Sequence, residues 1–142
     1  MRVMVILKAT PNSEAGVMPT SEEMERMIRF NEEMTAAGIL KAADGLKPSK
    51  FGKRVRFRGH GKKSITDGPF VETKELIAGY WIWEVKSMEE AMEWVMRCPD
   101  PCVGADCDVE VRPFFGPDDF GQEFTAELQK RVEDMHCAVP QA

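Results

Sequence analysis

Asp67, Glu72 and Lys74 lie close together in the segment Asp67–Glu75, DGPFVETKE. Neighbouring carboxylates can raise the pKa of one of the two, which then serves as a general acid or base. Lys74 would hold an anionic substrate. The segment therefore predicts acid–base chemistry, with Asp67 and Glu72 as catalytic residues and Lys74 as a substrate-binding residue.

The same segment also has a purely structural interpretation. Asp67 can close a turn with its side chain, Gly68 can adopt a positive φ, and Pro69 stiffens the exit from the turn. Such a turn could lead a hairpin into a short helix beginning near Glu72, where a carboxylate compensates the helix dipole. The sequence leaves both interpretations open.

Two further substrate-binding candidates flank this segment. His60 stands between two glycines at an expected hairpin tip, where a histidine is usually an exposed turn residue. Tyr80 lies in the aromatic run 79–85, GYWIWEV. That run could line a hydrophobic pocket, although an aromatic strand is first of all expected in a core or a dimer interface.

The four cysteines predict neither a disulfide framework nor a metal site. A chain of 142 residues that is 43% hydrophobic can form a core without staples, so reduced thiols are expected. Cys98, Cys102 and Cys107 have the spacing C-x3-C-x4-C, whereas zinc sites usually contain closer pairs. His136 or Cys137 could add a fourth ligand, but an incidental loop cluster is favoured, and no cofactor is predicted.

Charge and missing motifs argue against several classes of function. The net charge of −5 disfavours nucleic-acid binding, and the basic run 47–63 alternates with apolar residues as a half-exposed β-ribbon does. No apolar window approaches the roughly 20 residues that span a bilayer, and no export signal is visible, so a cytoplasmic protein is expected. Nucleotide-binding, serine-hydrolase and zinc-protease motifs are absent from the sequence.

Periodicity and capping signals predict the elements that position these residues. Strands are expected over 2–8, 39–46, 54–58, 64–66, 79–85 and 107–112. Helices are expected over 21–37, from a capping box of Ser87 and Glu90 to a residue before Pro99, and over 125–136, whereas 10–20 should be a loop. The first helix should bury an apolar stripe of Met24, Met27, Ile28, Met34 and Ile39, with Phe30 beside it.

This order of elements predicts an α+β fold with a ferredoxin-like antiparallel sheet and helices on one face. Residues 1–113 would form the domain, and residues 114–142 a C-terminal extension with one helix. Because the second face of the sheet would be bare, we expect a two-fold homodimer, around which the extension could wrap.

The segment Asp67–Glu75 resembles the signature of the DGPF family, DGPFAETKE, and departs from it only at Val71. The resemblance extends to the opening MRVMVILKA, to AAGIL before Asp44, to GYWIWEV, to EAMEWV and to VEVRP, and thus covers most of 1–113. The family is similar to the YCII domain. The resemblance implies a dimeric ferredoxin-like fold of the dimeric α/β-barrel type, with an activity that is generally unassigned.

In YCII relatives, a histidine on the first helix and an aspartate near the following strand have been proposed as a catalytic pair. Met27 stands at the position that matches the histidine, and Asp44 matches the aspartate. Without the imidazole, that proton-transfer mechanism is not carried over to this chain. Asp44 stays a substrate-binding candidate.

Two hypotheses on function follow. The first is a dimeric small-molecule-binding domain with its pocket between the sheet and residues 67–74, where acid–base catalysis could occur. The second is a regulatory interaction protein, because many members of the family are encoded near sigma factors of the extracytoplasmic-function type. An acidic surface on the extension would then bind a basic partner through Asp118, Asp119, Glu123 and Glu127.

Overall fold

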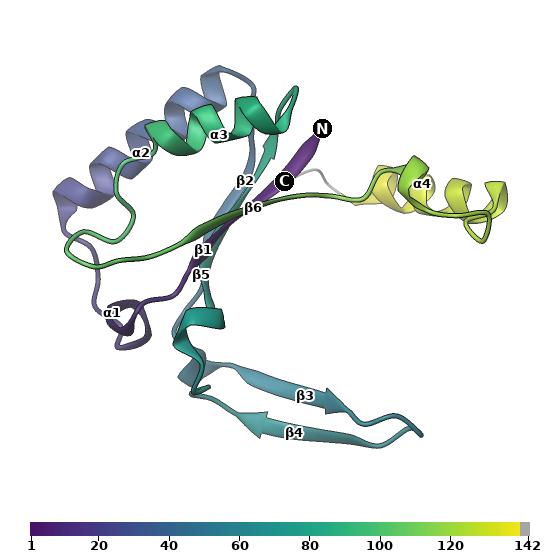
Figure 1. Ribbon diagram of the computed structural model, residues 1–142, viewed down its shortest axis with the longest axis horizontal. Helices are drawn as coiled ribbons and strands as arrows, with labels where there is room; N and C mark the ends of the chain where they lie inside the picture. Colours follow the sequence, from purple (N-terminus) through teal and green to yellow (C-terminus); the bar gives the residue numbers. More distant parts are fainter. Residues whose placement is uncertain (140–142) are drawn as a thin grey trace.

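A four-stranded antiparallel sheet with two helices on one face forms the body of the protein (Figure 1). The computed structural model describes residues 1–139, so 140–142 of the predicted extension lie outside the described residues. The strand order is β2-β5-β1-β6, with bounds β1 Arg2–Lys8, β2 Leu40–Gly45, β5 Ile77–Glu84 and β6 Val109–Pro113. This is the ferredoxin-like order, which confirms the predicted fold class.

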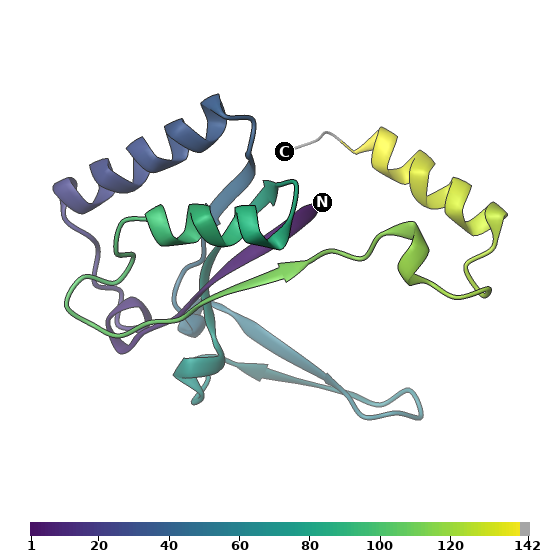
Figure 2. The same cartoon turned by 45° about the horizontal axis from the view of Figure 1, so that its top comes forward.

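The predicted hairpin forms a separate two-stranded sheet between β2 and β5 in the chain. Strands β3 (Lys53–Phe57) and β4 (Lys63–Asp67) pair only with each other in residues 1–139, with Val55 opposite Ile65. His60 has a φ of 50° at its tip, between two glycines that also have positive φ. The hairpin leaves the body on the side opposite the helices (Figures 1 and 2).

Helix α2 (Ser21–Ala36) begins at Thr20. The Thr20 hydroxyl accepts from the Glu23 N–H at 3.2 Å, and the Glu23 carboxylate accepts from the Thr20 N–H at 3.1 Å. Phe30 and Met34 are buried, as the predicted stripe requires. The inclusion of Ile28 was wrong, because it lies two residues before Phe30, roughly 200° around the helix, and is 56% exposed. Met24, which was also predicted to be buried, is 40% exposed.

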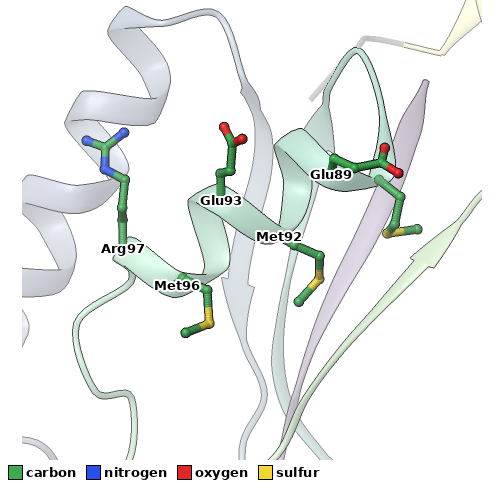
Figure 3. Close-up of a pocket in the computed structure, with 6 residues that line it drawn as sticks. Glu89, Met92, Glu93, Met96 and Arg97 are labelled. Carbon is green, nitrogen blue, oxygen red and sulfur yellow. The ribbon is translucent and has the colours of Figure 1, made fainter.

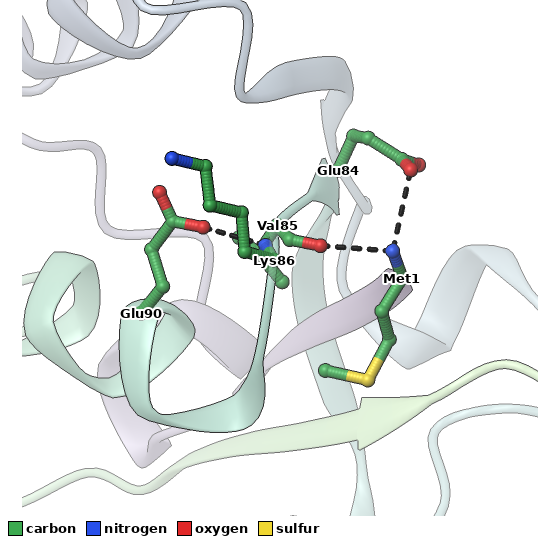
Figure 4. A network of polar contacts seen from close by, with 5 residues as sticks. All are labelled: Met1, Glu84, Val85, Lys86 and Glu90. Atoms are coloured by element: carbon green, nitrogen blue, oxygen red, sulfur yellow. Dashed lines mark hydrogen bonds and ion pairs between the residues drawn. The ribbon is translucent and has the colours of Figure 1, made fainter.

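Helix α3 (Met88–Arg97) packs beside α2 on the same face of the sheet (Figure 1). The Ser87 hydroxyl accepts from the Glu90 N–H, as predicted, but the second half of the capping box is displaced by one residue. The Glu90 carboxylate accepts from the N–H of Lys86 at 2.6 Å (Figure 4). The Ser87 hydroxyl and the Glu90 carboxylate therefore provide hydrogen-bond acceptors for two backbone N–H groups at the start of α3, those of Glu90 and Lys86.

The prediction of a loop over 10–20 was wrong at its beginning. Helix α1 (Pro11–Glu14) forms there, because Thr10 and Ser13 cap each other's N–H groups and Pro11 occupies the first turn. The helix expected near Glu72 is a 3-10 turn, η2 (Thr73–Glu75), and similar turns are η1 (Ser49–Phe51) and η3 (Pro117–Asp119).

The C-terminal helix α4 (Ala126–Ala138) is capped by Thr125, as predicted. It follows β6 after an irregular segment and lies apart from the sheet (Figure 2). Within residues 1–139, no helix combines the length and the apolar character needed to cross a membrane.

The core lies between the sheet and helices α2 and α3. Trp83 is 1% exposed and Met34 is fully buried at its centre. The indole N–H of Trp81 donates to the Asn31 side chain on α2 at 3.0 Å, which satisfies a polar atom at the sheet–helix boundary. Strand side chains alternate, so Val3, Val5, Trp81, Trp83 and Val85 face the helices.

The opposite side of the sheet, here called the open face, bears the alternate side chains of the same strands. In the strand register, Met4 lies opposite Ile82, and Ile6 lies opposite Tyr80. Charged residues surround this apolar strip: Arg2, Lys8, Glu84, Glu110 and Arg112. Among the described residues, no helix covers the open face (Figures 1 and 2).

Met34→Ala is expected to lower the free energy of unfolding by about 2–5 kcal/mol, because it leaves a cavity in the core. Ile28→Ala, on the exposed side of the same helix, should change it by about 0.5 kcal/mol or less. Urea unfolding followed by tryptophan fluorescence measures both. Equal losses in the two variants would contradict the orientation of α2.

Candidate functional site

The signature turn Asp67–Phe70 packs against the backbone just before the hairpin. The Gly68 N–H donates to the Gly52 carbonyl at 3.0 Å, and the Gly68–Pro69 peptide bond is cis. A Cβ added at Gly68 would lie 1.8 Å from the carbonyl oxygen of Ser49. Glycine is therefore required here by a close approach of two backbone segments.

Ser49 connects this turn to the beginning of the chain. Its hydroxyl donates to one oxygen of the Glu14 carboxylate at 2.5 Å, and its N–H donates to the other oxygen at 3.0 Å. The same hydroxyl accepts from the Phe70 N–H at 3.0 Å. Glu14 and Ser49 were not singled out in the sequence; the T-P-x-S pattern at Thr10 could have indicated the helix that carries Glu14.

The charged residues of the predicted catalytic segment lie on the surface. Asp67 forms an ion pair with Lys53 across the hairpin at 2.6 Å, with both side chains about 70% exposed. Glu72 precedes turn η2 and Lys74 lies within it, and both are exposed. In the described part of the chain, no hydrogen bond or ion pair joins Asp67 to Glu72.

His60 is not brought near these residues. It is exposed at the tip of the hairpin, whereas Asp67 lies at the base, at the other end of β4. The guanidinium of Arg54 lies 4.0 Å from the ring centroid of Phe70, which attaches the signature phenylalanine to the hairpin. The turn thus serves to fix the base of the hairpin.

Asp44 and Tyr80 are the two predicted residues that the structure brings together. They face each other across β2 and β5, and the Tyr80 hydroxyl donates to the Asp44 carboxylate at 3.3 Å. Tyr80 also lies opposite Ile6, which is only 7% exposed. A hydroxyl and a carboxylate therefore stand at the edge of the apolar strip on the open face, near the base of the hairpin.

Two hollows occur elsewhere on the surface. One, of about 770 Å³, is a shallow groove along α3, where Met92 and Met96 extend from successive turns to the same side (Figure 3). The other, of about 180 Å³, lies between the segment after β1 and the cysteine loop, with Thr10 and Cys102 in its lining. Neither includes the residues predicted for the site.

All four cysteines are unpaired thiols. Burial raises the pKa of Cys98 to about 11, with the Asp100 carboxylate adding to the shift. Burial and a hydrogen bond to Cys102 raise the pKa of Cys107 to about 12. These two thiols stay protonated at neutral pH and are poor nucleophiles. Within residues 1–139, no three His, Cys, Asp or Glu side chains are placed to hold a metal ion.

Gly68→Ala is expected to destabilise the protein by about 1–3 kcal/mol or more, because the added methyl group must displace the Ser49 backbone. The matched control is Gly45→Ala, whose Cβ would meet nothing within 4 Å and should change stability by about 1 kcal/mol at most. Urea unfolding measures both effects. A Gly68→Ala variant as stable as the control would contradict the packing of the signature turn.

Comparisons with known proteins show which family the domain belongs to. Residues 1–115 match the YCII-related domain. An uncharacterized protein of Rhizobium meliloti (strain 1021) is 30% identical over 100 residues, which cover 66% of this chain and 77% of the relative. A solved structure, a 5-chloro-2-hydroxyhydroquinone dehydrochlorinase of Burkholderia phenoliruptrix AC1100 in complex with 2,5-dihydroxybenzoquinone, aligns with a TM-score of 0.47 and 13% identity. That alignment covers 84% of this chain and 98% of the dehydrochlorinase.

The family match covers most of the chain and includes every strand of the four-stranded sheet, both helices packed on it, the hairpin and the signature turn. It ends just after β6, before the C-terminal helix. The chain belongs to the YCII-related domain family.

Proposed function

We propose that the protein is a homodimeric small-molecule-binding domain whose ligand lies against the open face, beside Asp44 and Tyr80. The observation that carries the proposal is the Tyr80–Asp44 hydrogen bond at the edge of an apolar strip. Apolar surface with a few polar groups at a fixed position is the usual composition of a ligand site. The expected compartment is the cytoplasm, since unpaired thiols suit a reducing environment.

The homodimer supplies the second wall of this site. An apolar sheet face that is left bare to water is a typical protein interface. A second copy related by a two-fold axis would lay the same face against this one, as closed symmetric oligomers do. The ligand would then be enclosed near Asp44, between the two sheets and the base of a hairpin.

The chemistry of the site suits a small molecule with an apolar body and a hydroxyl or similar group. The Asp44 carboxylate only accepts hydrogen bonds when ionised, whereas the Tyr80 hydroxyl both donates and accepts. A ligand hydroxyl could therefore donate to Asp44 and accept from Tyr80 at once. Met4 and Ile82, which are half-buried on the open face, would contact the apolar part.

Acid–base catalysis by Asp67 and Glu72, with Lys74 and His60 as binding residues, remains part of this proposal. The ion pair of Asp67 with Lys53 is about 70% exposed on both sides, and such pairs contribute only about 0–1 kcal/mol. A substrate could displace Lys53 at little cost and leave Asp67 available for proton transfer. His60, at the hairpin tip, would reach a ligand only from the hairpin of the second subunit.

A regulatory role with a sigma factor as partner is the second candidate. Its support is the acidic character of the C-terminal extension, together with exposed apolar residues such as Phe115, which is 77% exposed. Such a surface suits a basic partner with an apolar patch. Binding of the extension to a second copy of this chain would compete with this role.

An NMR titration with phenol tests the proposed ligand site, because this probe combines an apolar ring with a hydroxyl. We expect shifts at the backbone amides of Ile6, Tyr80 and Ile82. Asp44→Asn should weaken phenol binding by about tenfold, because a neutral amide oxygen accepts a weaker hydrogen bond than a carboxylate does. The control Asp118→Asn removes the same charge from the C-terminal extension and should leave the affinity unchanged.

Two results would contradict this site. Shifts confined to Met92 and Met96 would place binding in the groove along α3. A loss of affinity in Asp67→Asn but not in Asp44→Asn would move the site to the signature turn.

A further inference from the structure

The hairpin (residues 53–67) and the tail (residues 114–139) both project on the open side of the sheet (Figures 1 and 2). Strands β3 and β4 of the hairpin pair only with each other in the described chain. A two-stranded hairpin without further packing is at best marginally stable in water. The hairpin therefore needs a partner surface.

One face of the hairpin is apolar and flanked by lysines. Val55 and Ile65 are cross-strand neighbours, and the strand alternation places Phe57 on the same face. Phe57 and Ile65 are about 70% exposed, and the Lys63 ammonium lies 5.2 Å from the Phe57 ring centroid. Residues 53–67 contain six basic side chains and one acidic, a net charge of +5.

The tail has the complementary properties. Its apolar residues Leu128, Val132, Met135 and Val139 follow the spacing of a single stripe along α4, yet no residue of that helix is buried. Residues 114–139 contain six acidic and two basic side chains, a net charge of −4. An amphipathic helix with an uncovered stripe and a negative charge fits a basic, apolar surface.

The start of the tail is attached to the first strand of its own subunit. The Phe114 N–H donates to the Arg2 carbonyl at 3.0 Å, and the Arg2 guanidinium lies 4.7 Å from the Phe114 ring centroid. Beyond that point, the tilted rings of Phe115, Phe120 and Phe124 pack in succession, with ring centroids 5.2 and 4.8 Å apart. These contacts give the tail a defined shape while α4 stays uncovered.

We propose that the hairpin of each subunit packs on the tail of the other in the homodimer, so that two identical contacts close around the open faces. This inference rests on the homodimer of the proposed function and specifies its geometry. The apolar face of the hairpin, with Phe57 and Ile65, lies on the α4 stripe of the partner, and its lysines lie beside the acidic residues of that tail.

Charge selects this arrangement among the two-fold dimers that bring the open faces together. One such dimer places hairpin on hairpin and tail on tail. The two hairpins, each with a net charge of +5, then face each other, and so do the two tails, each with a net charge of −4. The other dimer places each hairpin on a tail, so that a net charge of +5 faces a net charge of −4 at both contacts. Like charges at an interface are unfavourable and opposite charges are favourable, so the second dimer is the more stable.

Charge-reversal variants of the full chain test the contact. The hairpin variant is Arg56→Glu/Lys62→Glu/Lys63→Glu. The tail variant is Glu123→Lys/Glu133→Lys/Asp134→Lys. The control, with the same charge change as the hairpin variant but outside both segments, is Arg26→Glu/Lys41→Glu/Lys86→Glu.

Sedimentation equilibrium gives the dimer Kd of each protein, and native mass spectrometry detects mixed dimers. Either variant alone should raise the Kd by at least about tenfold, because both of its contacts then oppose like charges. An equimolar mixture of the two variants should form a mixed dimer with a Kd well below that of either variant alone, because each hairpin again meets a tail of opposite charge. The control should dimerise as the wild type does.

A tail variant that dimerises like the wild type would overturn the hairpin–tail contact, as would a mixture that forms no mixed dimer. In either case a dimeric wild type would leave the proposed function standing. A monomeric wild-type protein would instead remove the homodimer, and the proposed function with it.

Discussion

The one-sided covering of the sheet is the constraint on which the rest of the structure depends. Helices α2 and α3 seal one face over Trp83 and Met34, while the other face keeps the half-buried Met4 and Ile82 without a helix above them. Apolar surface of that kind is removed from water in a stable protein. The hairpin and the tail both extend on the uncovered side. The second copy that we propose would therefore contact the open face, the hairpin and the tail.

The signature turn holds the hairpin in position relative to the sheet. The close approach of Gly68 to the Ser49 carbonyl, together with the Ser49–Glu14 hydrogen bonds, fixes the base of the hairpin to the segment after β1. The direction of the hairpin is therefore set by backbone packing. Asp44 and Tyr80 stand near that base, so the same turn would also shape the proposed ligand site.

The sequence predicted the sheet, the helices and the hairpin because each depends on local periodicity and capping. It missed the contact of Glu14 with Ser49, since hydrogen bonds between residues far apart in the chain leave no local pattern. Ile28 was misplaced because a methionine-rich helix has apolar residues on more than one side. For the site, Asp44 and Tyr80 meet through strand register, whereas Asp67 and Glu72 are close in sequence without being joined by a hydrogen bond.

The central claim is that a second copy of the chain covers the open face, and the oligomeric mass of Ile82→Asp tests it most directly. Ile82 is half-buried at the centre of that face, and a buried unpaired carboxylate would oppose association. The account predicts a wild-type mass of about twice 16.0 kDa and a folded, monomeric variant in sedimentation and circular dichroism. A monomeric wild type, or a variant that dimerises equally well, would contradict it.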